Sequence, residues 1–213
     1  LQALVGLSEA KKVMDQALNF YKAQKLFADR GFTDDHPAMH MIFTGNPGTA
    51  KTTVARLFAQ IMKENGLLSK GDLYEVGRAD IVGQYVGQTA PLVQKAFKKA
   101  KGGVLFIDEA YSLVDERDGL YGDEAINTIV QEMENNREDM VVIFAGYPDK
   151  MEGFLNKNPG LRSRIAFHIP FEDYTSEELC DIARLIASDK GVKLSDDAMK
   201  KLENIFELVV FTE

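Results

Sequence analysis

One short segment of the sequence combines the residue types that bind phosphate groups. The run Gly45-Asn46-Pro47-Gly48-Thr49-Ala50-Lys51-Thr52 joins small residues to a lysine and a hydroxyl. Small residues let backbone N–H groups turn toward phosphate oxygens, and a helix that follows adds the partial positive charge of its N-terminus. Lys51 supplies a point charge for the β- and γ-phosphates, and the Thr52 hydroxyl can ligate Mg²⁺. The run therefore predicts a nucleoside triphosphate site, which extends to Thr53.

Ala50 departs from the pattern G-x-x-x-x-G-K-[ST], which has glycine at this position. A methyl group is a small intrusion if the backbone φ angle there is negative. A positive φ angle would cost an alanine about 1 kcal/mol. The sequence leaves open whether Ala50 weakens nucleotide binding.

Two carboxylates, Asp108 and Glu109, follow the apolar run 104–107. Ligands bind at the carboxyl ends of strands in open parallel sheets, so acids at this point are candidates for chemistry. Asp108 can hold the hydration shell of Mg²⁺, and Glu109 can orient and polarise an attacking water molecule. Together with the upstream loop, the pair predicts hydrolysis of ATP to ADP.

These groups need a scaffold, and the apolar pattern predicts one of alternating strands and helices. A helical pattern opens at Ser8 and Glu9 and stops near Gly31. Apolar runs predict strands at 39–44, 73–76, 104–107, 140–145 and 165–169. Helical spacing predicts helices at 51–64, 89–99, 123–135 and 151–155. Such alternation implies parallel pairing through right-handed crossovers, so we expect an α/β fold with a parallel five-stranded P-loop NTPase core and flanking helices.

The alternation stops after Phe171, and helical patterns follow at 176–188 and 195–208. We therefore predict a nucleotide-binding core over residues 1–171 and a smaller helical domain over residues 172–213.

Composition narrows the class of protein. The chain has 213 residues and a formal net charge of -8, which argues against non-specific binding to nucleic acid. Its one cysteine, Cys180, allows no internal disulfide, so a reducing, cytoplasmic location is expected. No apolar run approaches the roughly 18 residues of a membrane helix, and no signal peptide opens the chain. We expect neither a membrane nor a nucleic acid as partner.

The loop and the acid pair, with several further segments, resemble the AAA+ ATPases, and most closely the subgroup of CbbX-type Rubisco activases and stage V sporulation protein K. The further segments are Leu4-Val5-Gly6-Leu7, Tyr85-Val86-Gly87-Gln88-Thr89-Ala90-Pro91, Ile107-Asp108-Glu109-Ala110-Tyr111, Val142-Ile143-Phe144-Ala145-Gly146-Tyr147 and Pro159-Gly160-Leu161-Arg162-Ser163-Arg164-Ile165. The resemblance covers nearly the whole chain. It implies an ATPase that works as a homo-hexameric ring and remodels a protein substrate.

Individual roles follow from the resemblance. Val5 and Gly6 match the segment that lies beside the adenine. Tyr85, Val86 and Gly87 match the loop that grips substrate chains in the central pore of the ring. An aromatic side chain between glycines suits that task, and the alternative is a tyrosine buried in a turn.

Arg164 matches the arginine that reaches into the ATP site of the neighbouring subunit, and Arg162 is the second candidate. The alternative is a pair of surface arginines matched with acids. Tyr147 is the candidate for the polar sensor of the γ-phosphate. The family's second sensor has no match before Glu213, so we expect the chain to end within the family's helical lid domain and to show weak turnover in isolation.

Two other functions stay open at this stage. A small-molecule P-loop kinase would use the loop and Asp108, but it would leave Glu109, the Tyr85 loop and the arginines without a role. A nucleotide-gated binding module with weak turnover is suggested by Ala50. The protein substrate is not identified by the sequence: Rubisco and a sporulation factor are both compatible with the resemblance.

Overall fold

A parallel sheet forms the centre of the computed structural model, which describes residues 4–32, 38–85, 87–114 and 119–210. Within these ranges the sheet has five strands in the order β2-β3-β4-β1-β5. The strands are β1 (His40–Thr44), β2 (Leu73–Val76), β3 (Val104–Ile107), β4 (Val141–Gly146) and β5 (Ile165–Pro170). All neighbouring pairs are parallel, which confirms the predicted fold class.

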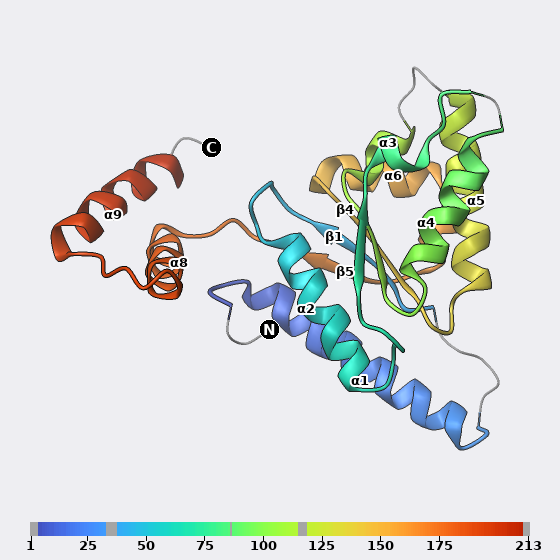
Figure 1. The fold of residues 1–213 in the computed structure, drawn as a ribbon, viewed down its shortest axis with the longest axis horizontal. Coiled ribbons are helices and arrows are strands. Elements are labelled where there is room, and N and C mark those ends of the chain that lie inside the picture. Colours follow the sequence, from blue (N-terminus) through green and yellow to red (C-terminus); the bar gives the residue numbers. More distant parts are fainter. Residues whose placement is uncertain (1–3, 33–37, 86, 115–118, 211–213) are drawn as a thin grey trace.

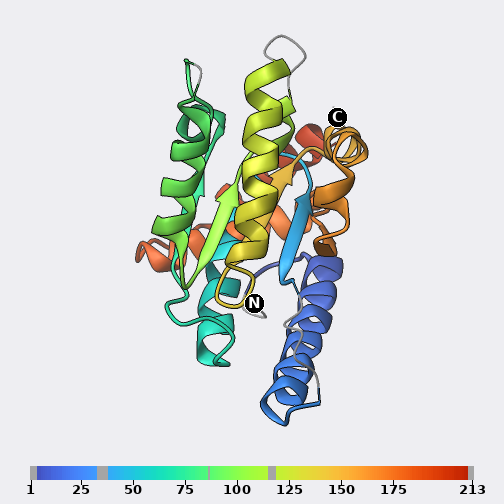
Figure 2. The same ribbon diagram turned by 90° about the vertical axis from the view of Figure 1, so that its right-hand side faces the viewer.

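Helices cover both faces of the sheet, as parallel strands require for their crossovers (Figure 1). One face packs against α1 (Ser8–Asp29) and α2 (Lys51–Glu64). The other face packs against α3 (Arg78–Ile81), α4 (Thr89–Ala100), the 3₁₀ helix η1 (Ala110–Val114), α5 (Gly119–Asn135), α6 (Pro148–Lys157) and α7 (Pro159–Arg162). Figure 2 looks onto this second face, where α4 and α5 lie side by side.

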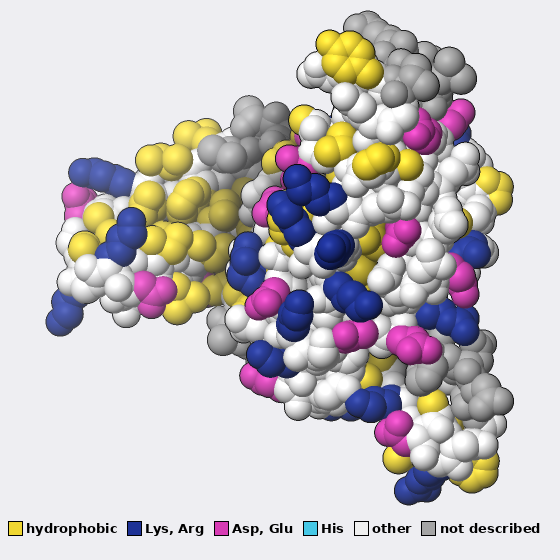
Figure 3. Space-filling view, turned by 45° about the vertical axis from the view of Figure 1, so that its right-hand side comes forward, with side chains coloured by type: hydrophobic (Ala, Val, Ile, Leu, Met, Phe, Trp, Pro, Cys, Tyr) yellow, Lys and Arg dark blue, Asp and Glu magenta, His cyan; other side chains and the backbone are white. Residues whose placement is uncertain are grey.

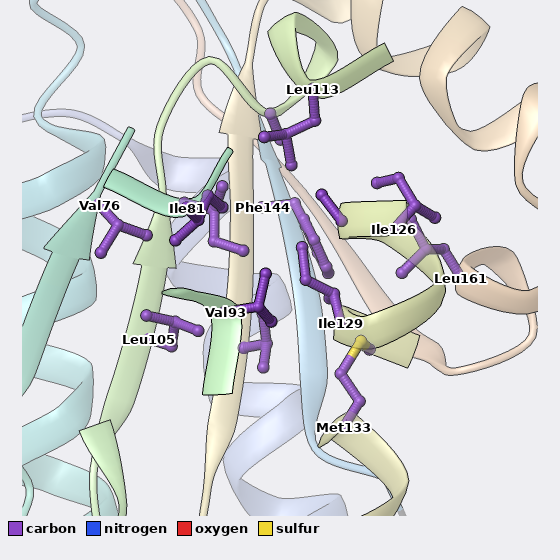
Figure 4. Close-up of a cluster of buried hydrophobic side chains, with 14 of the residues drawn as sticks. Val76, Ile81, Val93, Leu105, Leu113, Ile126, Ile129, Met133, Phe144 and Leu161 are labelled. Atoms are coloured by element: carbon purple, nitrogen blue, oxygen red, sulfur yellow. The ribbon is translucent and has the colours of Figure 1, made fainter. Parts of the chain in front are cut away.

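Alternate residues of the central strands enter two separate hydrophobic clusters. Val104 and Phe106 face α1 and α2, whereas Leu105 and Ile107 face the opposite helices. Figure 4 shows the second cluster, which includes Val76, Val93, Leu105, Ile129, Met133 and Phe144. Because both faces are buried, the strands are continuously apolar rather than alternating, as the sequence pattern indicated.

The strand order brings three loops to one edge of the sheet. Strand β1 lies beside β4, with Thr44 paired to Gly146, and β3 lies on the other side of β4. Since the strands run in the same direction, the residues that follow β1, β3 and β4 meet at the carboxyl edge. These segments carry the phosphate loop, the acid pair and Tyr147, for which the sequence predicts roles in ATP binding and hydrolysis.

The chain ends in two helices, α8 (Ser176–Asp189) and α9 (Asp196–Val210), which lie to one side of the sheet (Figure 1). Hydrophobic side chains gather on the lobe that these helices form, at the left of Figure 3. Leu185, Ile205 and Leu208 are 48%, 53% and 71% exposed. No helix in the described ranges is long and apolar enough to cross a membrane.

Short elements and helix boundaries differ from the sequence prediction. Helices α3, η1 and α7 are too short to produce a periodic pattern. In α3, for example, the amino end is capped by Asp80, whose Oδ2 accepts a hydrogen bond from Gly77 N at 2.8 Å. Helix α5 was predicted to begin at Asp123 but begins at Gly119. At Gly122 an added Cβ would lie 2.2 Å from the Leu113 carbonyl oxygen, so tertiary packing favours a glycine that the helical pattern disfavours.

Candidate functional site

The loop between β1 and α2 closes around the ammonium group of Lys51. Its Nζ donates hydrogen bonds to the carbonyl oxygens of Gly45 and Asn46 at 2.8 and 2.6 Å. The Thr49 hydroxyl donates to the Asn46 carbonyl at 2.7 Å and tightens the turn. Burial lowers the pKa of Lys51, and the carboxylates of Asp108 and Asp173 act in the opposite direction. The lysine therefore lies on the concave side of the loop.

Gly45 fixes the loop between two strand ends. Its N–H donates to the Gly146 carbonyl at 3.1 Å, which ties the loop to the end of β4. A Cβ at residue 45 would lie 2.5 Å from the carbonyl oxygen of Phe171, just beyond β5. Only glycine fits this position without displacing backbone.

Ala50 adopts the left-handed conformation that its position in the pattern demands, with φ 61° and ψ 21°. Its carbonyl nevertheless accepts the first helical hydrogen bond of α2, from Val54 N at 2.9 Å. The alanine therefore keeps the glycine-like path of the loop, at a strain of about 1–2 kcal/mol. A methyl group at this position is compatible with an intact loop.

We expect Ala50→Gly to raise the free energy of unfolding by about 1 kcal/mol, because the strain exceeds the entropic cost of glycine. Thermal unfolding should then shift upward by about 2–4 °C. The matched control is Ala23→Gly, at an exposed site inside α1, which should lower stability by about 1 kcal/mol. A destabilised Ala50→Gly variant would contradict the assigned strain. Nucleotide affinity and turnover measured on the same variant test whether the alanine affects function.

The acid pair lies at the end of β3 with an unusual backbone. Glu109 has φ 47°, and its N–H donates to Asp108 Oδ1 at 2.9 Å. Non-glycine residues in this region cost about 1–3 kcal/mol and persist where the surrounding structure enforces them, commonly at functional sites. The conformation turns Glu109 into the cavity beside the phosphate loop.

One cavity of about 470 Å³ collects most of the residues that the sequence singled out. Its lining includes Pro47, Gly48, Ala50, Lys51, Thr52, Thr53, Asp108, Glu109 and Tyr147, together with Gly45, Tyr111 and Gly146. Asn46 and Thr49 instead line an adjoining cavity of about 780 Å³ with Asp173, Tyr174 and Leu179. Tyr147 lines both cavities.

The donor set of the first cavity fits a magnesium ion. The Thr52 hydroxyl and the Asp108 carboxylate are oxygen donors from different elements, and both face the same space. Mg²⁺ in nucleotide sites is held by one or two protein oxygens, phosphate oxygens and water. The same two residues are those that the sequence predicted for this role.

The start of the chain meets the C-terminal helices near the adjoining cavity. A Cβ at Gly6 would lie 2.5 Å from Glu178 Oε1, so the glycine permits a close contact with α8. Glu178 Oε2 also accepts from Thr175 N at 2.9 Å and caps that helix. Asn46 Nδ2 donates to both Asp173 oxygens, at 3.1 and 2.8 Å. Val5 and Gly6 therefore lie outside the first cavity, beside the segment that carries α8.

The two arginines lie away from the cavity. Both precede β5, at the amino edge of the sheet, whereas the phosphate loop is at the carboxyl edge. Arg164 Nη1 donates to the Gly160 carbonyl at 3.0 Å, and its Nε forms an ion pair with Glu134 at 3.4 Å without hydrogen-bond geometry. Arg162 Nη1 donates to Asn156 Oδ1 at 2.7 Å. The pairing with an acid that the sequence left as an alternative is present for Arg164. Neither arginine is among the residues that line the cavity.

Tyr85 lies on an exposed turn, so the alternative of a buried tyrosine is wrong. Its side chain is 67% exposed, and its carbonyl accepts from Gln88 N at 3.2 Å. Gly87 has φ 80°, a conformation that favours glycine. Val86 lies outside the described residues.

Sequence reasoning assigned no role to several neighbours of the site. Tyr111 lines the cavity beside Glu109, and Lys150 lies 4.7 Å from its ring centre. The negative charge of Asp173 acts to raise the pKa of Lys51, and its carboxylate accepts a hydrogen bond from Asn46 Nδ2. The only signal for Tyr111 was its place two residues after the acid pair, in the segment Ile107 to Tyr111.

Comparisons with known proteins agree with the geometry. Residues 41–173 match the model of the ATPase family associated with various cellular activities (AAA). The protein CbxX, chromosomal, of Cupriavidus necator is 49% identical over 198 residues, which are 92% of this chain and 62% of that protein. Protein CbbX of Cereibacter sphaeroides is 48% identical, over 92% of this chain and 63% of its own length. The chloroplastic ribulose bisphosphate carboxylase/oxygenase activase of Cyanidioschyzon merolae is 46% identical, over 92% of this chain and 68% of its own length.

The fold also resembles solved structures. The crystal structure of the FIGL-1 AAA domain in complex with ADP superposes with a TM-score of 0.65 and 21% sequence identity. The match covers 97% of this chain and 65% of that chain. At this level of identity the likeness concerns the fold alone. Among the curated relatives, the chain spans only 62% of the length of the first one named.

Proposed function

The chain belongs to the AAA family of ATPases, and on this premise we propose that its cavity binds ATP and hydrolyses it to drive the remodelling of a protein substrate. One observation carries the proposal. Lys51 begins α2 and the pair Asp108 and Glu109 follows β3, yet all three line the same cavity at the carboxyl edge of the sheet.

The division of labour follows from the positions of the side chains. The backbone of the phosphate loop and Lys51 hold the β- and γ-phosphates. Glu109 orients a water molecule in line with the γ-phosphate and accepts its proton. Thr52 would hold Mg²⁺ directly, and Asp108 would hold it through water. When bound, that ion neutralises charge that develops on the phosphates.

We assign the ribose and base to the adjoining cavity, which Asn46, Thr49 and Tyr147 line. We assign Val5 and Gly6 to the side of the adenine, as the family resemblance implies. Tyr147, which lines both cavities, takes the place of the γ-phosphate sensor. We propose a core (residues 1–171) and a lid (residues 172–213), with the base bound between them. The segment that joins the two parts lies between the end of β5 at Pro170 and the start of α8 at Ser176.

We propose that identical subunits assemble into a ring, with six as the number that the family resemblance implies, and the placement of the arginines supports this. Arg164, with Arg162 as the second candidate, stands at the opposite edge of the sheet from the cavity of its own chain. Each cavity therefore needs the arginine of a neighbouring copy, which stabilises negative charge on the transferring phosphoryl group.

We expect the complete protein to hydrolyse ATP without any acceptor molecule, at a rate per subunit that rises steeply with protein concentration. The physical reason is that each site is completed by a second copy. Phosphate release over a dilution series, with light scattering on the same samples, measures both quantities. A rate per subunit that stays constant, together with phosphoryl transfer to a small alcohol, would instead indicate a small-molecule kinase.

The exposed Tyr85 turn is the proposed contact with the protein substrate. We expect Tyr85→Ala to keep basal ATP hydrolysis within about twofold and to lose substrate remodelling, since the aromatic ring provides the grip and lies outside the cavity. Tyr85→Phe, which keeps the ring, is the matched control and should retain remodelling. Rubisco is the first substrate to assay, because one relative is named as its activase. Remodelling by the alanine variant would refute the assignment.

A sporulation factor as substrate and a cytoplasmic location stay predictions.

A further inference from the structure

Tyr111 lies two residues after Glu109 in the sequence and lines the same cavity. It belongs to η1, which begins directly after Glu109 and is tied to it by the Ser112 N–H, which donates to the Glu109 carbonyl at 2.8 Å. Glu109 has a positive φ angle, a conformation that persists only where the surrounding structure enforces it.

We propose that Tyr111 is a positioning residue for Glu109, whose carboxylate it holds by a hydrogen bond so that one oxygen faces the attacking water. This inference rests on the proposed function. A carboxylate has two oxygens and several acceptor sites, so it can accept the phenol proton and still receive a proton from water. Fixing the carboxylate in one direction favours the geometry needed for reaction.

The ring of Tyr111 is held by three neighbours. An added Cβ at Gly146 would lie 2.8 Å from Tyr111 Cε1, so the glycine at the end of β4 lets the ring pack against the backbone. The ring of Tyr147 lies 6.1 Å away between centroids. Lys150 Nζ lies 4.7 Å from the centre of the Tyr111 ring and 5.2 Å from that of Tyr147. These contacts restrict where the hydroxyl can point.

The hydroxyl remains a hydrogen-bond donor at neutral pH. Burial, and then the negative charge and hydrogen bond of Glu109, raise the pKa of Tyr111 to about 12. The phenol therefore stays protonated at neutral pH and can donate its proton in a hydrogen bond.

The test is Tyr111→Phe in the complete protein, at concentrations where subunits associate. This change removes the hydroxyl and keeps the ring with its packing. We expect kcat for ATP hydrolysis to fall about 10- to 100-fold, with KM and ATP affinity unchanged. Tyr74→Phe is the matched control, because Lys99 also lies over the Tyr74 ring, at 5.0 Å, and donates to its hydroxyl at 3.1 Å. Tyr74→Phe should leave kcat unchanged.

The same change made in a Glu109→Gln background separates positioning from a structural effect. If Tyr111 acts through the Glu109 carboxylate, residual single-turnover hydrolysis in Glu109→Gln should not fall further when Tyr111→Phe is added. Equal losses in both backgrounds, or a kcat of Tyr111→Phe equal to that of the parent, would overturn the inference. Near-parental turnover in Glu109→Gln alone would instead refute the role of Glu109 in the proposed function. Equal thermal unfolding and ATP affinity for parent and variant show that the variant folds.

Discussion

Replacement of Glu109 by glutamine is expected to lower ATP hydrolysis by about 100- to 10,000-fold while ATP affinity stays within a few-fold of the parent. Glutamine keeps the size of the side chain and loses the ability to accept a proton from water. The phosphate loop and Lys51, to which we assign nucleotide binding, are untouched. The variant should therefore hold ATP in a long-lived complex, detectable as retained nucleotide after gel filtration.

Glu64→Gln provides the matched control for this change. Glu64 is exposed at the last turn of α2, and Lys51 in the cavity begins the same helix. The helix separates the two residues by about 20 Å, so the control should hydrolyse ATP at the parental rate. Hydrolysis by Glu109→Gln within a few-fold of the parent would assign the proton acceptor to another group. Loss of ATP binding would show that Glu109 serves binding.

Arg164→Ala is expected to lower hydrolysis by about 10³- to 10⁵-fold, the range measured for arginines supplied by a partner molecule. ATP binding by isolated subunits should persist, since Arg164 does not line the cavity of its own chain. The measurement is steady-state hydrolysis at concentrations where the parent forms rings. Arg162→Ala is the companion variant, and a larger loss there would move the role to Arg162.

A mixing experiment distinguishes a shared site from a folding defect. Arg164→Ala subunits keep Glu109, and Glu109→Gln subunits keep Arg164, so mixed rings contain some cavities with both groups intact. We expect two inactive preparations to regain hydrolysis when combined and allowed to exchange subunits. A mixture that stays inactive, with exchange verified by labelled subunits, would contradict a site shared between copies.

The sequence predicted the phosphate loop and the acid pair because each is a local pattern between a strand and a helix. Its alternation of strands and helices also predicted the sheet, since strands buried on both faces are continuously apolar. The conformation of Ala50 could not be predicted in this way, because an alanine at that position is compatible with either sign of φ until the flanking strands fix the loop.

Other features depend on contacts between distant segments. The ion pair of Arg164 with Glu134 joins the start of β5 to α5, and no spacing in the sequence reports it. The packing of Tyr111 against Gly146 depends on β3 and β4 being neighbours. One-turn helices such as α3 and α7 escape prediction because a single turn gives no period to recognise.

The opposite placement of Arg164 and the cavity has a genetic consequence. In the proposed ring, a subunit that lacks the arginine would damage the site of its neighbour and leave its own intact. In a cell that makes normal and altered chains from two gene copies, both kinds of chain would enter the same assemblies. Each altered subunit would then inactivate the ATP site of a normal neighbour. An Arg164 allele is therefore expected to behave as dominant over the normal copy. An altered chain that cannot join the assembly would instead be recessive.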